Sequence, residues 1–529
     1  MAEESQKPEA NEETVTTETL VAEPAPETET TKQVDHLPVV TDAVEPEEQK
    51  IAQSVSFKEE TNFVSELPEA QKKALDELKQ LIHDALSKHE FTFVPPIHEE
   101  EKASEPGTLT EAVVEIVKAE SVVESEVVTP AESGVERPTD ATEDSGETVE
   151  TIKETLVEVV ATEEVAATEV PKDCAVEPAL EASQVEPEEV FIWGIPLVGD
   201  ERSDVVLLKF LRARDFKVKE AFVMIKNTVK WRKEFGIETL LEEDLGSELE
   251  KTAFMRGIDK EGHPVCYNVY GAFQDKDLYQ TCFSDDEKRV KFLRWRIQFL
   301  EKSIRKLDFK PGGVCTIVQV NDLKNSPGPT KRELRQATNQ AVHLLQDNYP
   351  EFVAKQVFIN VSWWYLAFNR MISPFLTQRT KSKFVFAGPS KSAETLFKYV
   401  APEQVPVQYG GLNREGERDF CVSDPVTEIT IRPSCKHTVD FPATEKCTLL
   451  WELRVIGWEV NYGAEFVPND VEGYTVIASK TRKVSPVDEP LINEAFKIGE
   501  AGKMVLTIDN QTFRKKKLLY RFKSKPVVE

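Results

Sequence analysis

Hydrophobic positions recur with a helical period in a short segment near the N-terminus. Between residues 69 and 88 an apolar side chain returns every three or four positions, and Pro68 stands where a helix can begin. The stripe consists of Ala74, Leu75, Leu78, Leu81, Ile82, Ala85 and Leu86. We therefore predict an amphipathic helix within residues 56–94. An isolated helix of this length is marginal in water, so we expect it to dock on the rest of the chain; a helix that is free or lies on a membrane is the alternative.

From residue 204 onward the pattern is that of a folded body. Residues 189–255 are predicted to form a small helical lobe, and residues 256–415 alternate between strand-like and helix-like segments, which predicts an α/β layer with parallel strands. The expected strands are 264–269, 314–320, 356–361 and 383–386, and the expected helices are 285–307, 331–347, 364–371 and 392–399.

The helical pattern ends at Gly411. Residues 416–529 contain only short strand-like segments, which predicts a separate, all-β sandwich. Its expected strands are 427–431, 448–455, 473–478, 503–509 and 517–522.

Charge is divided unequally along the chain. Residues 1–190 hold 49 Asp and Glu against 13 Lys and Arg, a net charge of −36; the whole chain carries −29, so residues 191–529 carry +7. Residues 1–55 and 95–188 are acidic and nearly free of aromatic side chains, and we predict that they are disordered because they cannot bury enough apolar surface. The mildly basic body suits an anionic membrane surface, which would repel the acidic tail.

The distribution of cysteines and apolar stretches predicts a cytoplasmic protein. The seven cysteines are scattered and form no CxxC pair, as expected in a reducing compartment. The N-terminus lacks the pattern of a signal peptide. The most apolar stretch, residues 357–376, contains Arg370 and Pro374, which argue against a transmembrane helix. We therefore expect any membrane contact to be peripheral.

Motifs of the common enzyme classes are absent from the sequence. It contains no GxxxxGK[ST], no GxGxxG after a strand, no GxSxG and no HExxH. The seven histidines are dispersed and lack metal-ligand spacing with the cysteines. We predict no catalytic residue, no metal, no cofactor and no nucleic-acid partner.

Several landmarks within residues 204–412 occur in order. They are FLRARDFKVKEAF and WRKEFGI in the lobe, followed by CTIVQVNDLKN, LLQDNYPEFVAKQVFINVSWWYLAFNRMISPFLTQRTKSKFVF and VAPEQVPVQYGGL. Together they resemble the CRAL-TRIO lipid-transfer family. The helix predicted within residues 56–94 also resembles the first helix of that family's N-terminal lobe. In this chain the acidic insertion separates it from the rest of the lobe. The resemblance implies a hydrophobic cavity that encloses one lipid.

The resemblance also implies a mobile gate helix that closes the cavity, at about residues 364–375. Its apolar face would consist of Phe368, Met371, Ile372, Phe375 and Leu376. Ordinary core packing of this segment is the alternative.

A phosphoinositide signature can be carried over from the family residue by residue. Its Glu in the YPE motif and the Lys 32 positions later correspond to Glu351 and Lys383, and the Thr three residues before that Lys is Thr380. The arginine that ends the FLRAR motif is Arg214. Arg214 and Lys383 could bind a phosphate, Thr380 could donate a hydroxyl hydrogen bond, and Glu351 could orient Lys383. The alternative for Glu351 and Lys383 is an ion pair that only braces the fold.

The chain departs from the phosphatidylinositol-transfer pattern at two places. Asp215 stands where a basic residue follows the FLRAR arginine, and the strand serine expected near residues 314–318 is apolar. Both departures affect the inferred choice of headgroup, whereas the lipid-binding class is unaffected.

The last hundred residues resemble a GOLD domain through WELRVIGWEV, VEGYTVIASKT and KMVLTIDNQTFRKKKLLYRF. A GOLD domain after a CRAL-TRIO body resembles the patellin family. The basic end at residues 514–517 fits either a strand edge blunted by lysine or a contact with a membrane or an acidic protein.

The patellin resemblance implies a non-enzymatic protein that binds or transfers a phosphoinositide in membrane trafficking, at the cell plate or plasma membrane. One alternative is a trafficking adaptor whose GOLD domain and acidic tail bind proteins. Another is a carrier of a different hydrophobic molecule, such as a tocopherol or retinoid; an uncharged headgroup would not require the Glu351–Lys383 pair.

Overall fold

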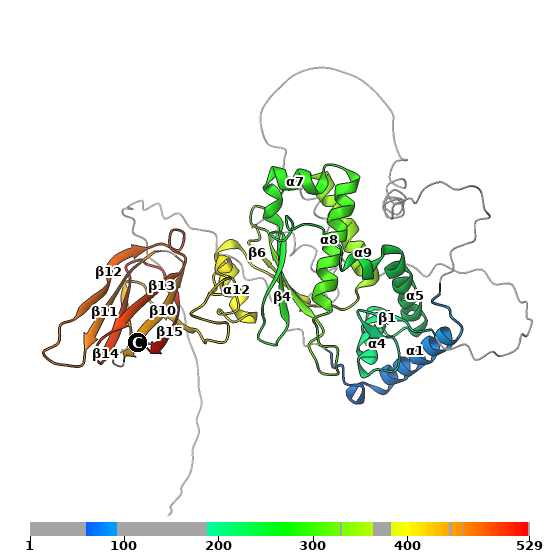
Figure 1. The fold of residues 1–529 in the computed structure, drawn as a ribbon, viewed down its shortest axis with the longest axis horizontal. Helices are drawn as coiled ribbons and strands as arrows, with labels where there is room; N and C mark the ends of the chain where they lie inside the picture. The colour runs from blue at the N-terminus through cyan, green and yellow to red at the C-terminus, as the bar shows by residue number, and fades with distance from the viewer. Residues whose placement is uncertain are drawn as a thin grey trace, which may run out of the picture. The chain divides into compact units, whose positions relative to one another are not determined.

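The computed structural model describes residues 60–92, 188–327, 331–362, 382–443, 447–457 and 459–526. The predictions of disorder for residues 1–55 and for all but the last residue of 95–188 concern parts of the chain outside these ranges. Three parts of the described chain follow one another: a helical lobe, an α/β layer and a β sandwich (Figure 1). This confirms the predicted fold class.

The helical lobe is built from segments on both sides of the acidic insertion. It contains η1 (Val64–Glu66), α1 (Glu69–Ser87), the two-stranded hairpin of β1 (Phe191–Ile192) and β2 (Ile195–Pro196), α4 (Glu201–Ala213), α5 (Val218–Phe235) and α6 (Ile237–Leu240). Asp200 and Ser203 form a capping box that begins α4, and Gly236 ends α5 in a left-handed conformation.

The amphipathic helix α1 packs against α4 and α5 (Figure 1). Leu75, Leu78 and Ile82 are fully buried, in the same core cluster as Leu208 and Phe210. Leu81 is only partly buried. The apolar stripe of this helix is therefore covered by the lobe and not by a membrane.

Both ends of the insertion meet at the lobe. The carboxylate of Glu188 accepts hydrogen bonds from the Phe91 backbone nitrogen at 3.2 Å and from Thr92 Oγ1 at 2.8 Å. The Glu188 nitrogen donates to the Leu86 carbonyl at 3.1 Å. Glu188 therefore belongs to the folded lobe, which corrects its assignment to the acidic insertion.

The α/β layer contains a five-stranded sheet of order β3-β4-β5-β6-β7. Its strands are β3 (Ala253–Ile258), β4 (Pro264–Val269), β5 (Ile317–Asp322), β6 (Val353–Ile359) and β7 (Phe384–Phe386). Strands β4 to β7 are parallel, as predicted. The antiparallel edge strand β3 was not predicted, and it begins inside the range assigned to the lobe.

The helices of this layer are η2 (Tyr270–Gln274), α7 (Lys276–Phe283), α8 (Asp286–Ile304), α9 (Arg332–Asn348), η4 (Pro389–Lys391), α12 (Ser392–Tyr399) and η5 (Val407–Tyr409). One face of the sheet packs against α12, through a core that includes Tyr267, Val320, Val357 and Leu396. Helices α8 and α9 lie on the other side of the strands (Figure 1). Among the described residues every helix is too short or too polar to cross a bilayer.

The β sandwich consists of two antiparallel four-stranded sheets, β13-β10-β15-β8 and β12-β11-β14-β9. Their bounds are β8 (Thr427–Ile431), β9 (Cys435–Ala443), β10 (Cys447–Ile456), β11 (Val460–Pro468), β12 (Val476–Val484), β13 (Ile492–Ile498), β14 (Gly502–Asn510) and β15 (Lys516–Pro526). The sequence predicts five strands here; β9, β11 and β13 are additional.

The burial of α1 leads to a first prediction. Leu78→Ala should lower the free energy of unfolding by about 2–5 kcal/mol, because it leaves a cavity in the lobe core. Leu81→Ala, on the same helix but only partly buried, serves as the matched control and should cost clearly less. Chemical denaturation of the full chain measures both. Equal losses would contradict docking of α1 through its buried stripe.

Candidate functional site

Glu351 and Lys383 meet at one edge of the sheet. Glu351 lies in the turn before β6, and Lys383 directly precedes β7; these two strands are paired in parallel, with Phe384 opposite Gln356, so both residues lie toward the same end of the sheet. Lys383 Nζ lies 2.9 Å from Glu351 Oε2, and the two side chains are 16% and 20% exposed. A half-buried cation and carboxylate are thus held together where a polar group could still reach them.

The backbone of Glu351 is unusual, because its φ of 53° lies in the left-handed region. This conformation is unfavourable for most residues other than Gly, Asn and Asp. Such strain costs on the order of 1–3 kcal/mol and persists only where the surrounding structure fixes it. The contacts around Glu351 therefore have to hold this backbone conformation.

A buried ion pair holds the turn from the side of α8. Arg232 of α5 contacts Glu301 of α8 with two hydrogen bonds of 2.5 and 3.1 Å, and the Tyr349 hydroxyl donates to the same carboxylate at 2.7 Å. Burial and the neighbouring Glu301 carboxylate raise the pKa of Tyr349 well above its ordinary value, so the hydroxyl remains a donor. Tyr349 stands two residues before Glu351, so this group fixes one end of the turn.

Lys209 of α4 holds the same turn from the lobe. Its Nζ donates to the carbonyl oxygen of Glu351 at 2.8 Å and to that of Cys315 at 2.9 Å. The ammonium also lies 4.2 Å from the centre of the Phe352 ring. Lys209 was not among the predicted site residues, although a lysine inside the apolar run VVLLKFL was a visible signal.

Of the four predicted headgroup residues, the structure brings two into contact. Arg214 follows the last residue of α4, and its guanidinium donates to the carbonyl of Ala213 at 3.0 Å. Among the described residues, no ion pair joins it to Glu351. Thr380 lies outside the described residues, as do the predicted gate residues Phe368, Met371, Ile372, Phe375 and Leu376.

The other arginine of the FLRAR motif has a different role. Arg212 is buried, with its Nε 2.8 Å from Glu60, and it donates to the Asn62 side chain at 2.7 Å and to the Thr61 carbonyl at 2.6 Å. It therefore binds the segment that leads into α1.

A row of amide side chains crosses the sheet on the face opposite α12. Arg296 of α8 donates to Asn268 Oδ1, and Asn268 donates to Asn321 Oδ1, both at 2.9 Å. Beside this row the rings of Phe358 and Phe386 stack with centres 5.0 Å apart. This face of the sheet combines hydrogen-bonding groups with aromatic surface, as a floor beneath an amphiphilic ligand would require.

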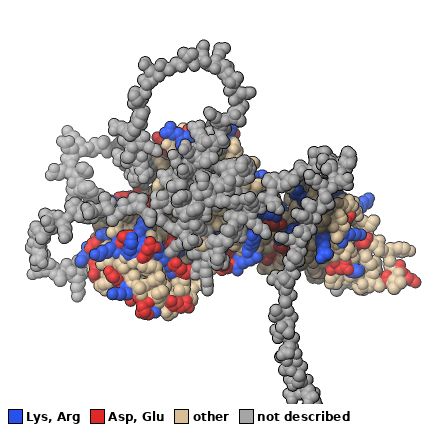
Figure 2. All heavy atoms as spheres, turned by 180° about the vertical axis from the view of Figure 1, so that it is seen from behind, with Lys and Arg blue, Asp and Glu red and all other residues tan. Residues whose placement is uncertain are grey.

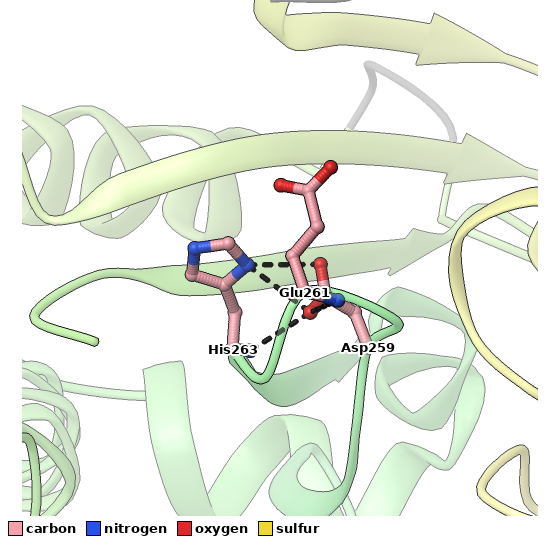
Figure 3. A group of neighbouring side chains, drawn as sticks. All are labelled: Asp259, Glu261 and His263. Carbon is pink, nitrogen blue, oxygen red and sulfur yellow. Dashed lines mark hydrogen bonds and ion pairs between the residues drawn. The ribbon is translucent and has the colours of Figure 1, made fainter. Parts of the chain in front are cut away.

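Asp259, Glu261 and His263 gather in the hairpin between β3 and β4 (Figure 3), with potential ligand atoms within 4.8 Å of one another. Asp259 Oδ1 accepts from the backbone nitrogens of Glu261 at 2.9 Å and His263 at 2.8 Å, and its Oδ2 lies 3.0 Å from His263 Nδ1. Burial opposes ionisation of Asp259, but the hydrogen bonds from His263 keep its pKa below the ordinary value. The carboxylate is already used to shape the turn, so we assign the group to the hairpin.

These features define a class of protein, an α/β lipid-transfer-type body of the CRAL-TRIO kind with a helical lobe before it and a β sandwich after it. Three family models match: the CRAL/TRIO N-terminal domain at residues 170–227, the CRAL/TRIO domain at 250–411 and the Patellin-1-like C-terminal GOLD domain at 432–517. They cover the parts of the chain where the sequence showed the two resemblances.

Comparison with individual proteins identifies the family. The chain is 66% identical to Patellin-5 of Arabidopsis thaliana over 339 residues, which cover 64% of this chain and about half (51%) of Patellin-5. It is 41% identical to Patellin-4 of the same plant over 91% of this chain and 92% of that protein. The chain belongs to the patellin family, which confirms the resemblance found in the sequence. A more distant relative is the phosphatidylinositol transfer protein SFH5 of Meyerozyma guilliermondii, 30% identical over 44% of this chain and 72% of that protein.

The buried pair of Arg232 and Glu301 leads to a second prediction. Arg232→Met should lower the free energy of unfolding by about 3–5 kcal/mol, because Glu301 would be left as an uncompensated buried charge. Lys230→Met on the same helix removes a cation whose ion pair with Glu234 is exposed, and should cost less than about 1 kcal/mol. Thermal and urea unfolding measure both. A loss at Arg232 no larger than that at Lys230 would refute the structural role of the pair.

Proposed function

We propose that this protein is a non-enzymatic lipid-binding protein that holds a phosphoinositide at the edge of its sheet and acts peripherally in membrane trafficking. The observation that carries the proposal is the pairing of Lys383 with a strained Glu351 at a half-buried position. A phosphate would contact the Lys383 ammonium, and Glu351 would orient that ammonium or accept from an inositol hydroxyl.

Two further observations support this proposal. The amide row and the stacked phenylalanines give the sheet a face suited to an amphiphile. A relative with 30% identity is named as a phosphatidylinositol transfer protein. Arg214 and Thr380 remain candidates for the same headgroup, and the residues around Phe368 and Phe375 remain candidates for the gate. Patellin membership favours the cell plate or plasma membrane as the place of action.

A protein adaptor is the second candidate function. It is favoured by apolar side chains on the sandwich that stand in solvent, such as Val471, which is 99% exposed, and Tyr474, which is 88% exposed. A pull-down that requires the sandwich but tolerates loss of lipid binding would favour this function.

Our third prediction tests the headgroup residues. Lys383→Ala should weaken loading of phosphatidylinositol 4-phosphate about tenfold or more, because it removes a charge-assisted contact worth roughly 1.5–3 kcal/mol. Loading of phosphatidylcholine should change much less. Glu351→Asn should act in the same direction, because asparagine accepts the left-handed backbone but cannot reach Lys383.

The control for this experiment is Lys391→Ala, which removes an exposed lysine of η4 that pairs with Glu394. If Glu351 and Lys383 only brace the fold, their variants will melt at lower temperature and lose both lipids equally. That outcome, with unchanged lipid preference in the folded fraction, would refute the site.

The fourth prediction concerns the acidic regions. On the face drawn in Figure 2, Lys and Arg side chains are interspersed with Asp and Glu, so attraction to a membrane would come from the small positive excess of the body. A variant without residues 1–55, and with 97–183 replaced by a short flexible linker, keeps α1 and the bonded ends Thr92 and Glu188.

This variant should bind anionic vesicles more tightly than the full chain at low salt. The difference in binding should shrink at physiological ionic strength, because salt then screens charges that lie more than about 8 Å apart. Sedimentation with anionic vesicles measures the effect, and neutral phosphatidylcholine vesicles are the control. Equal binding by both proteins at low salt would exclude a tuning role for the acidic regions.

A further inference from the structure

Lys209 is a lysine in the hydrophobic core. It is 1% exposed and stands between Leu208 and Phe210, which are fully buried. Burial of an ammonium group is costly unless hydrogen bonds replace its water shell. A leucine at this position would have continued the apolar run of α4 without this cost. The role of Lys209 therefore lies in the contacts that its ammonium group makes.

The ammonium of Lys209 reaches the point where the parallel strands β5 and β6 begin. The Cys315 carbonyl lies two residues before β5, and the Glu351 carbonyl lies two residues before β6; Lys209 Nζ binds both. Directly beyond, the Ile317 nitrogen donates to the Phe352 carbonyl at 2.8 Å. Lys209 therefore ties the peptide group that follows Glu351 to the start of the sheet.

This contact acts on the strained residue. The direction of the Glu351 carbonyl is set by its ψ angle, and its φ of 53° sets where its side chain points relative to the backbone. With the carbonyl held by Lys209 and Tyr349 held by Glu301, Glu351 cannot relax to a more favourable conformation without losing buried hydrogen bonds. Its carboxylate is thereby kept at the ammonium of Lys383.

We infer that Lys209 is a positioning residue for the lipid headgroup: it acts through Glu351, and it sets headgroup preference by holding Glu351 in the conformation that meets Lys383. This inference rests on the proposed function of the Glu351–Lys383 pair. It adds a residue of the lobe to a site otherwise formed by the turn before β6 and the start of β7.

The chain offers a matched control on the same helix. Arg212 is a second buried cation of α4, 8% exposed, and it binds Glu60, Thr61 and Asn62. Truncation of either residue removes a buried cation from the lobe and should destabilise the fold. Only Lys209 contacts Glu351, so only its loss should change which lipid is bound.

The experiment uses the full chain carrying Lys209→Met, Arg212→Met, Lys383→Ala or the double change at 209 and 383. Each protein is incubated with vesicles of phosphatidylinositol 4-phosphate and phosphatidylcholine in equal parts, and the lipids bound to the folded protein are measured by mass spectrometry. Lys209→Met should lower the ratio of the first lipid to the second about three- to tenfold, the range expected for coupled neighbouring groups. Arg212→Met should leave the ratio unchanged, and the double variant should match Lys383→Ala alone.

An unchanged ratio in Lys209→Met, with a lowered ratio in Lys383→Ala, would overturn the role of Lys209 and leave the proposed function standing. An unchanged ratio in Lys383→Ala would overturn the proposed function and this inference with it. Equal reductions in Lys209→Met and Arg212→Met would show a general effect of lobe instability and also overturn the inference. If Lys209→Met does not fold, Lys209→Gln and Arg212→Gln replace the two methionine variants. The glutamine side chain is shorter than that of lysine and reaches the Glu351 and Cys315 carbonyls less well. A smaller reduction of the ratio is therefore expected in Lys209→Gln and none in Arg212→Gln, and an unchanged ratio in Lys209→Gln would overturn the role of Lys209.

Discussion

The junction between the helical lobe and the α/β layer depends on the buried ion pair of Arg232 and Glu301. Glu301 has no exposed surface and Arg232 is 6% exposed, so each charge is tolerable only because the other is present. Burial opposes the charge on Arg232, but the hydrogen bond to Glu301 raises the pKa of Arg232 above its ordinary value. Arg232 comes from the lobe and Glu301 from the α/β layer, so the pair fixes α5 against α8.

The same pair determines where the candidate site lies. Tyr349 donates to Glu301 and therefore anchors the turn that contains Glu351, while Lys209 reaches the other side of that turn from α4. The turn is thus held by Lys209 of the lobe helix α4, by Glu301 of α8 in the α/β layer and by the strand that follows it. The candidate headgroup position lies where lobe and sheet meet, and a displacement of the lobe would change the geometry of Glu351 and Lys383 directly.

The parts of the fold that the sequence predicted are those with a strong repeat. The stripe of α1 and the alternation that produces β4 to β7 were visible because long segments repeat the same pattern. Other strands were hidden by residues that usually interrupt strands. Pro442 lies in β9, which stands at the edge of its sheet, where a missing backbone donor is tolerated. Gly463 lies in β11, where a Cβ would approach Thr481 Oγ1 to 2.8 Å, so the glycine permits close contact with β12.

The candidate site was predictable only where a family spacing named the residues. Glu351 and Lys383 are 32 residues apart; the parallel pairing of β6 with β7 places both at the same end of neighbouring strands, and their side chains span the remaining distance. The contacts of Lys209 could not be predicted in this way. Its acceptors are the backbone carbonyls of residues 315 and 351, and a sequence does not distinguish one backbone carbonyl from another. Arg212 and Arg214 cannot be told apart by composition. Their roles differ because Arg212 is the buried member, within α4, whereas Arg214 follows its last residue and points to its own neighbour.

The acidic insertion shows how the lobe tolerates a long interruption. Its ends are joined by the hydrogen bonds of Glu188 to Phe91 and Thr92, so the chain leaves and re-enters the lobe at the same place. The entropy cost of closing such a loop grows only slowly with its length, and no core position has to change to accommodate more residues. Helix α1 can therefore contribute Leu75 and Leu78 to the core although acidic sequence lies on both sides of it. Packing and charge are separated along the chain: the lobe fixes the turn at Glu351, and most of the acidic excess lies in the segments on either side of α1.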